Sequence, residues 1–151
     1  MSVIAYDSAS PQHIPVNAAA VFPYSDGSYA WSHARFPRAR YRYITVRGDV
    51  NSDIADYEEG AVFGAAALRT WANDRLEKHG NHADLTVYCD KDNFPAVKAA
   101  MAGFTWHLFL STLDGTQPQS YDGMQCRAVQ YTDRSDLYDM SVVWDESWLN
   151  R

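Results

Sequence analysis

Two acidic residues, Asp56 and Glu58, stand two positions apart in the stretch "SDIADYEEGAVF" (residues 52–63). They stand at the end of a run with the pattern of a β-strand, just before a run with the pattern of a helix. Because side chains alternate along a strand, positions i and i+2 point to the same side, with Cα atoms about 7 Å apart. The two carboxyls are therefore expected to converge on one ligand.

Two converging carboxyls suit the cleavage of a glycosidic bond. One carboxyl protonates the leaving oxygen, and a second negative group stabilises the oxocarbenium-like transition state or activates water. Crowding also raises the proton affinity of one carboxyl, as a general acid requires near neutral pH. The alternative is that these acids are N-terminal charges of the following helix, favoured by its dipole, and for Glu59 this is the preferred interpretation.

Three further acids occupy comparable places. Asp7 closes the first predicted strand, Asp26 follows the second in "YSDG", and Asp139 stands near the start of "YDMSVV", the last predicted strand. In parallel α/β folds the loops after the C-terminal strand ends form the active face. We therefore expect Asp7, Asp56, Glu58 and Asp139 to share one face of the fold.

Eight short apolar stretches separated by turn residues predict the strands that position these acids. They cover residues 2–7, 18–24, 41–46, 53–58, 84–90, 105–111, 126–132 and 138–143. Strands that alternate with helices in the middle of the chain indicate α/β units with a parallel sheet, and eight strands suggest closure into a barrel.

Two helices are predicted between these strands. The first follows the fourth strand, with Phe63, Ala67, Trp71 and Leu76 on one stripe and Gly80 as C-cap. The second covers "NFPAVKAAMAG", which begins with Asn93 as N-cap and has proline in its first turn.

Chain length limits the architecture. A complete (β/α)8 barrel typically needs about 250 residues, whereas this chain has 151. We therefore expect one α/β domain spanning residues 1–151, a compact, eroded (β/α)8 TIM-like barrel with several crossover helices missing or shortened. An open doubly wound sheet is the alternative.

Composition argues against several classes of partner. A hydrophobic content of 46% suits a domain with a core, and a net charge of -6 argues against nucleic acid or anionic lipid as a partner. No apolar run approaches the roughly 20 residues that span a bilayer, and the N-terminus "MSVIAYDSAS" lacks the basic and long apolar regions of a signal peptide. We expect synthesis in the cytoplasm without a signal peptide.

No metal or other cofactor is expected. His79 and His82 lie in a polar connector without nearby cysteine or converging carboxylates. Cys89 is predicted at the C-terminal end of one strand and Cys126 at the N-terminal start of another. Parallel strands of about five residues separate these ends by on the order of 15 Å, beyond the roughly 7 Å Cα separation of a disulfide, so both thiols should be free.

The order of several short segments resembles the glycoside hydrolase family 25 lysozymes, in particular small lysozyme-like proteins of actinobacteria and their phages. The matching segments, in chain order, are "AYD" ending at Asp7, "DYE" at residues 56–58, "LTVYCD" at 85–90, "VQYTD" at 129–133 and "YDMSVV" at 138–143. They extend over nearly the whole chain. Two features differ: the region between Asp7 and Asp56 is shorter, and "LFLSTLDG" lacks the aromatic usually found at the end of the sixth strand, which would thin the groove walls.

The resemblance implies an N-acetylmuramidase that cleaves bacterial cell-wall peptidoglycan. Glu58 would be the general acid, Asp56 the second carboxylate, and Asp7 and Asp139 supporting acids. A phage-encoded enzyme of this kind would be released at lysis or carried on the virion. The alternative is a non-catalytic glycan- or protein-binding module, on a virion or cell surface, that keeps the same fold.

Aromatic side chains near the predicted strand ends suit a sugar site. Flat rings can stack on sugar faces, and the candidates are Tyr24, Tyr29, Trp31, Tyr57, Tyr88 and Tyr131. Packing in the core is the alternative for each ring, and it is preferred for Trp71 and Trp106. With the resemblance taken into account, the expected substrate-binding residues are Tyr24, Asp26, Tyr88, Gln130 and Tyr131.

Overall fold

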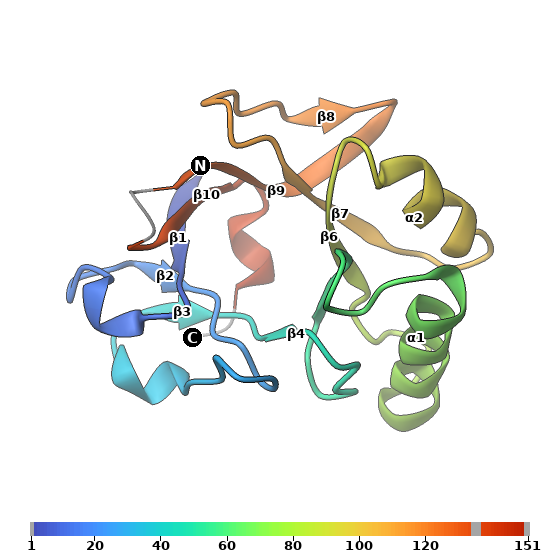
Figure 1. Cartoon of the computed structure of the whole chain (residues 1–151), viewed down its shortest axis with the longest axis horizontal. Coiled ribbons are helices and arrows are strands. Elements are labelled where there is room, and N and C mark those ends of the chain that lie inside the picture. The colour runs from blue at the N-terminus through green and yellow to red at the C-terminus, as the bar shows by residue number, and fades with distance from the viewer. Residues whose placement is uncertain (1, 134–136, 150–151) are drawn as a thin grey trace.

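One curled β-sheet runs through the computed structural model, which describes residues 2–133 and 137–149 (Figure 1). Its strands are β1 (Val3–Asp7), β2 (Ala20–Val21), β3 (Arg40–Tyr41), β4 (Ile44–Thr45), β5 (Ile54–Asp56), β6 (Thr86–Asp90), β7 (His107–Ser111), β8 (Ser120–Tyr121), β9 (Met124–Asp133) and β10 (Asp139–Val143). The α-helices in the described residues are α1 (Ala65–His79) and α2 (Phe94–Ala100), and short 3-10 turns cover Pro11–His13, His33–Arg35 and Glu146–Trp148.

The strands are hydrogen bonded in the order β3-β2-β1-β10-β9-β7-β6-β5-β4, with β8 attached to β9. Neighbours are parallel from β3 to β1 and from β9 to β4. In contrast, β10 runs antiparallel to both β1 and β9. The chain is thus a mixed α/β protein with a sheet curled into a half-barrel, and the predicted fold class is confirmed at this level.

Strands β3 and β4 stand at opposite ends of this strand order, yet only two residues separate them along the chain. The segment 40–45 runs alongside residues 19–25, with Arg40 N donating to Ala19 O (3.0 Å) and Ile44 N to Pro23 O (2.8 Å). A parallel bridge also joins Ile44 to Tyr24. Backbone hydrogen bonds therefore connect β4 back toward β2.

Each of the eight predicted strand stretches overlaps at least one observed strand, and the stretch 41–46 overlaps both β3 and β4. Strand β8 was missed. It forms a hairpin with β9 through Asp122 and Gly123, both at positive φ (50° and 76°). An Asp-Gly pair is a favoured two-residue hairpin turn, because both residues adopt this conformation readily.

Helix α1 begins later than the sequence pattern suggested. Gly60 and Gly64 both have positive φ, and the helix starts after Gly64. Its buried residues are Leu68, Trp71, Ala72 and Arg75, which form the i, i+3, i+4, i+7 stripe of a helix packed on a core. The predicted stripe was correct for Trp71 and wrong for Phe63 and Ala67, which are exposed, while the expected C-cap at Gly80 is confirmed.

The curled sheet has an apolar layer on each face. On the outer face α1 and α2 lie together beside β6 and β7 (Figure 1), and Trp71, Val97 and Met101 pack against this side of the sheet. On the inner face Phe22, Ile54 and Phe109 pack with Trp148 from the C-terminal 3-10 turn. Within the described residues, none of the helices has the length and apolar character needed to cross a membrane.

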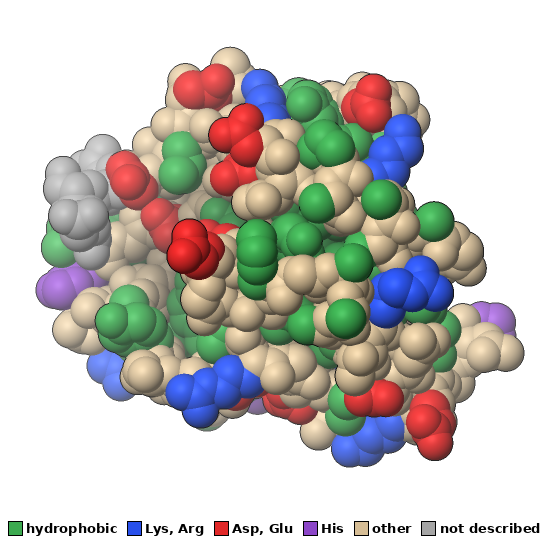
Figure 2. Space-filling model, turned by 45° about the vertical axis from the view of Figure 1, so that its right-hand side comes forward, with side chains coloured by type: hydrophobic (Ala, Val, Ile, Leu, Met, Phe, Trp, Pro, Cys, Tyr) green, Lys and Arg blue, Asp and Glu red, His purple; other side chains and the backbone are tan. Residues whose placement is uncertain are grey.

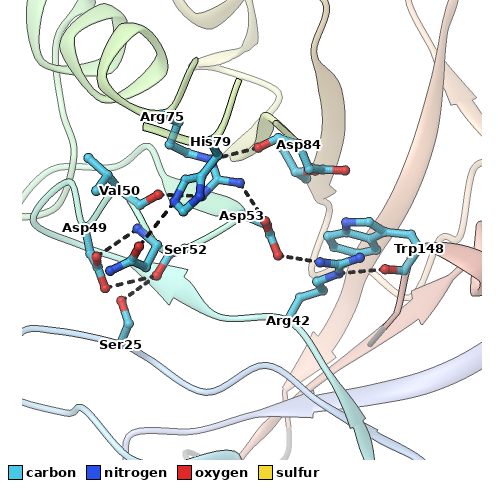
Figure 3. Close-up of polar contacts among 12 residues, drawn as sticks. Ser25, Arg42, Asp49, Val50, Ser52, Asp53, Arg75, His79, Asp84 and Trp148 are labelled. Atoms are coloured by element: carbon cyan, nitrogen blue, oxygen red, sulfur yellow. Dashed lines mark hydrogen bonds and ion pairs between the residues drawn. The ribbon is translucent and has the colours of Figure 1, made fainter. Parts of the chain in front are cut away.

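A polar network centred on Asp53, just before β5, joins α1 to the segment between β3 and β4 (Figure 3). The Asp53 carboxylate accepts from Arg42 Nη1 (2.6 Å) and from Arg75 Nη2 (2.7 Å). Arg75 is 3% exposed and also donates to the carbonyls of Val50 and Asp84. Arg42 donates to the carbonyl of Trp148 and so ties the C-terminal turn to the sheet.

Candidate functional site

The four predicted acids converge at one end of the curled sheet. Asp7 is the last residue of β1 and pairs in register with Asp139, the first residue of β10. Asp56 is the last residue of β5, and Glu58 follows two positions later. All four line a cavity of about 220 Å³, so the predicted convergence of these acids is confirmed.

This inner cavity shares Tyr24, Asp56, Glu58 and Asp139 with an outer bowl of about 490 Å³. Among the described residues, the bowl is also lined by Asp26, Glu59 and Asp133, with Arg47 as its basic residue. Figure 2 shows acidic side chains gathered over one part of the surface beside the grey atoms. The site combines negative charge with a volume in the range of small-molecule pockets.

The acids differ in their exposure to solvent. Asp7 and Asp56 are buried, at 3% and 5% exposed. Asp139 is half-buried, and Glu58 is exposed. Asp56 Oδ1 has no hydrogen-bond donor among the described protein groups. Glu58 is therefore the member of the Asp56–Glu58 pair that an entering molecule meets first.

Burial raises the pKa of Asp56 to about 9, and the charge of Glu58 and a side-chain hydrogen bond with Glu58 add to this effect. Two neighbouring carboxyls cannot both ionise easily, so one of them keeps a proton. The Asp56–Glu58 pair thus holds one proton at neutral pH. A carboxyl group protonated at this pH is what a general acid requires.

Asp7 and Asp139 form a second pair of carboxyls. Burial, followed by the charge of Asp139, raises the pKa of Asp7 well above its usual value. Burial also raises the pKa of Asp139, while hydrogen bonds with Asp7 and Gln130 oppose that rise. The site therefore contains two proton-sharing pairs that face one cavity.

Neutral hydrogen-bonding groups surround these pairs. Tyr24 donates its hydroxyl to Asp7 Oδ1 (3.0 Å), and Tyr88 donates its hydroxyl to Gln130 Oε1. Burial raises the pKa of both tyrosines above the usual value, so both hydroxyls stay protonated and act as donors. Tyr24, Tyr88 and Gln130, three of the expected substrate-binding residues, line the inner cavity with the acids.

Two other predicted substrate-binding residues have different surroundings. Asp26 lines the outer bowl, but its carboxylate accepts from Thr45 Oγ1 (2.5 Å) and from the Val46 N–H (2.7 Å). It fixes the turn after β2 to the end of β4. Tyr131 follows Gln130 on β9, points to the opposite face and packs against the core beneath the helices. The structure does not bring Tyr131 to the acids.

The remaining candidate aromatics divide between surface and core. Tyr29 is exposed and lines the outer bowl. Trp31 donates its Nε1 to the carbonyl of Ser8 (3.0 Å) and packs on Phe36. Tyr57 is buried in the outer-face core, so it is a packing residue. Of these three rings, Tyr29 alone faces the acid-lined bowl.

The helix-terminus interpretation of the acids is wrong. Helix α1 begins at Ala65, and its first turn contains no acidic residue. Glu59, for which this interpretation was preferred, is exposed and lines the bowl instead. The residues between Glu59 and α1 form a turn, in which Ala61 N donates to Glu58 O (3.0 Å) and Val62 N donates to Asp56 O (3.0 Å).

Sequence reasoning missed several residues of the cavity wall. Leu113 lines the inner cavity, and Arg47, Asp133 and Tyr138 line the bowl. Asp133 and Tyr138 flank the connection between β9 and β10, so the strand ends predicted there could have indicated them. Leu113 lies in a turn and carries no sequence signal for a site.

Within residues 2–133 and 137–149, no group of three or more histidine, cysteine or acidic side chains has an arrangement suited to a metal ion. Proton transfer by carboxyl groups, with tyrosine hydroxyls as hydrogen-bond donors, is the chemistry that the acids and tyrosines of the cavity offer.

Comparisons with protein-family models, with curated proteins and with solved structures each found no match to this chain.

Proposed function

We propose that this chain is a glycoside hydrolase of the lysozyme (N-acetylmuramidase) type that cleaves bacterial cell-wall peptidoglycan. The observation that carries the proposal is the set of four carboxyls, Asp7, Asp56, Glu58 and Asp139, in one cavity at the end of the sheet. Glycosidic cleavage needs both a protonated and an ionised carboxyl at the scissile bond. The muramidase specificity rests on the order of the sequence segments that resemble family 25.

Glu58 is the proposed general acid because it is the exposed member of a pair that holds one proton at neutral pH. It donates a proton to the leaving oxygen of the glycosidic bond. Asp56, behind it, holds the shared proton when no substrate is bound and passes it to Glu58. After the transfer both carboxyls are negative, which stabilises positive charge developing on the sugar ring. A water molecule then bonds to the anomeric carbon, and the proton that it loses returns to the Asp56–Glu58 pair.

Asp139 and Asp7 have a supporting role in this proposal. Asp139 is half-buried and lines both the inner cavity and the bowl, so its carboxyl can reach a sugar hydroxyl. Asp7 lies beneath Asp139, and its Oδ1 accepts a hydrogen bond from the hydroxyl of Tyr24. Hydrogen bonds between the Asp139 carboxyl and sugar hydroxyls orient the sugar ring against the Asp56–Glu58 pair, and orientation contributes strongly to rate.

We also propose that the curled sheet is an eroded (β/α)8 barrel. The support is the backbone pairing of residues 19–25 with residues 40–45, which links the two ends of the strand order. Barrel enzymes place their active sites at the C-terminal ends of their parallel strands. Asp7 and Asp56, the last residues of β1 and β5, lie at such ends.

Clearing of a peptidoglycan suspension tests the hydrolase. The wild type should reduce turbidity and release new reducing ends, whereas Glu58→Gln should lose at least about 100-fold in rate, because proton transfer typically contributes that much. Glu77→Gln, the same change at an exposed position of α1, is the matched control and should keep full activity. An active Glu58→Gln variant would rule out the assignment of the acid.

A non-catalytic glycan-binding module is the second candidate function. It is favoured by exposed apolar side chains near the cavities, since Tyr29 and Leu113 are 64% and 52% exposed. A wild type that binds peptidoglycan without producing reducing ends would support the module and contradict the hydrolase.

A further inference from the structure

Leu113, in the turn after β7, has a backbone conformation that is unusual for leucine. Its φ is +53°, in the left-handed region where the Cβ of an L-residue meets the carbonyl oxygen. The cost is about 1–2 kcal/mol for a residue other than glycine, asparagine or aspartate. A leucine in this position lowers the stability of the fold unless its side chain has a compensating role.

Asp122 provides a comparison, because it is the other described non-glycine residue at positive φ (50°). It is followed by Gly123 in the two-residue turn of the β8–β9 hairpin, where aspartate is a favoured residue. Local turn chemistry explains Asp122. No equivalent preference explains a leucine at position 113.

Hydrogen bonds around Leu113 fix its conformation. Thr112 N and Leu113 N both donate to the carbonyl of Gln130 (2.9 and 3.3 Å), and Gly115 N donates to the carbonyl of Tyr131 (2.8 Å). Thr112 Oγ1 also donates to the carbonyl of Thr116 (2.9 Å). The turn is thereby attached to β9 at the position whose side chain, Gln130, lines the inner cavity.

The side chain of Leu113 lines the cavity that contains Asp7, Asp56, Glu58 and Asp139, yet it is 52% exposed. Ile44 and Phe109 also line this cavity, but they are buried in the core. Leu113 is thus the large aliphatic side chain of the inner cavity that an entering molecule can cover. Because strained residues concentrate at ligand sites, the observed outlier supports a functional role.

We propose that Leu113 is a substrate-binding residue that forms the apolar wall of the inner cavity and packs against the C–H face of a sugar ring. This inference rests on the proposed glycoside-binding function and adds the residue that selects a ring with an apolar face. The acids and tyrosines bind the polar edge of the ring, while Leu113 contacts its face. Covering Leu113 also removes apolar surface from water, which favours binding.

Three variants test the proposal. Leu113→Asn keeps a side chain of similar size, tolerates positive φ and removes the apolar contact; Leu113→Gly removes both the strain and the side chain. Asp122→Gly is the control: it places glycine at the other described non-glycine position with positive φ, away from the site. It also removes an ion pair between Asp122 and Lys98, both largely exposed, which contributes little to stability.

Binding of a soluble N-acetylglucosamine oligosaccharide is measured by calorimetry, and hydrolysis by reducing-end release. We expect both Leu113 variants to bind about ten-fold more weakly, with the loss mainly in KM, because a lost apolar contact in a pocket has an effect of this size. Their melting temperatures should equal that of the wild type or exceed it by roughly 2–4 °C. Asp122→Gly should bind and hydrolyse as the wild type does.

The outcomes separate this inference from the proposed function. If the wild type binds the oligosaccharide without hydrolysing it and the Leu113 variants bind weakly, the inference stands and the hydrolase proposal fails. If the wild type hydrolyses it and the Leu113 variants match its affinity and KM, the inference fails and the hydrolase stands. A wild type that binds neither the oligosaccharide nor peptidoglycan overturns both.

Discussion

Asp7 and Asp139 are register partners across the antiparallel pair of β1 and β10, and both side chains line the same cavity. Because β10 runs in the opposite direction to β1, its first residue lies beside the last residue of β1. The two carboxyls are therefore neighbours, and the proton affinity of each depends on the charge of the other.

Asp139→Asn should lower the pKa of Asp7. The charge of Asp139 and its hydrogen bond both raise that pKa, after the larger effect of burial. The pKa is measured by NMR titration of the Asp7 side-chain carboxyl carbon in the wild type and the variant. Asp92→Asn, at an exposed position between β6 and α2, is the control and should leave Asp7 unchanged. An identical Asp7 titration in Asp139→Asn would contradict the pairing.

Asp56→Asn should stabilise the fold at neutral and higher pH. The pKa of Asp56 is about 9 in the folded protein, against about 3.9 in an unfolded chain. The folded state binds the extra proton between these values, so this group's contribution to stability is present at low pH and decreases as pH rises through that window. At pH 7 the decrease reaches at most about 4 kcal/mol, from about three pH units at about 1.4 kcal/mol each.

Urea unfolding of the wild type and Asp56→Asn at several pH values between about 5 and 9 measures this difference. The free energy of unfolding of Asp56→Asn relative to that of the wild type should increase with pH. The variant should also hydrolyse peptidoglycan more slowly than the wild type does. Asp92→Asn should give a constant difference across the same range. A pH-independent difference for Asp56→Asn would show that Asp56 is ionised in the folded protein.

Asp53→Asn should destabilise the fold substantially, because it removes the charge that Arg42 and Arg75 share. Arg75 is buried, and an uncompensated buried charge typically costs about 3–5 kcal/mol. Lys98→Ala, which removes the exposed pair with Asp122, should cost less than about 1 kcal/mol. Free energies of unfolding from urea titration compare the two, and equal losses would contradict a structural role for the network in Figure 3.

Both cysteines should be free thiols that react only after unfolding. Cys89 and Cys126 are unbonded and buried in the structure, and burial raises their pKa values to about 12 and about 11. A thiol reagent added without reductant should therefore react slowly with the native protein and find two groups after denaturation. An intramolecular bridge in the mass spectrum would contradict the parallel register of β6, β7 and β9.

The positions of the acids could largely be predicted from local patterns. Alternation along β5 correctly indicated that Asp56 and Glu58 share a side, since Tyr57 between them is buried in the opposite core. The same alternation separates Gln130 from Tyr131 on β9, but the sequence did not show that only one of this pair would meet the acids. Alternation along a strand shows that the side chains of successive residues point to opposite faces of the sheet. Packing decides which of these faces encloses the cavity.

The start of α1 illustrates a different limit. The apolar spacing from Phe63 suited a helix, yet Gly60 and Gly64 adopt positive φ, and the chain turns between Asp56 and Ala65. Hydrogen bonds from Ala61 and Val62 to Glu58 and Asp56 hold this turn. These contacts direct Glu58 and Glu59 to the site rather than to a helix terminus, and hydropathy alone does not encode them.

The sequence by itself determined the eight strand stretches, the two helical segments and the acids at the strand ends, because these depend on short-range alternation and turn residues. Only the tertiary structure decided that β10 is antiparallel, which brings Asp139 to Asp7, and that Leu113 is held at positive φ beside the acids. Strand direction and cavity walls depend on hydrogen bonds and packing between segments far apart in the chain. Local residue preferences carry no information about those contacts.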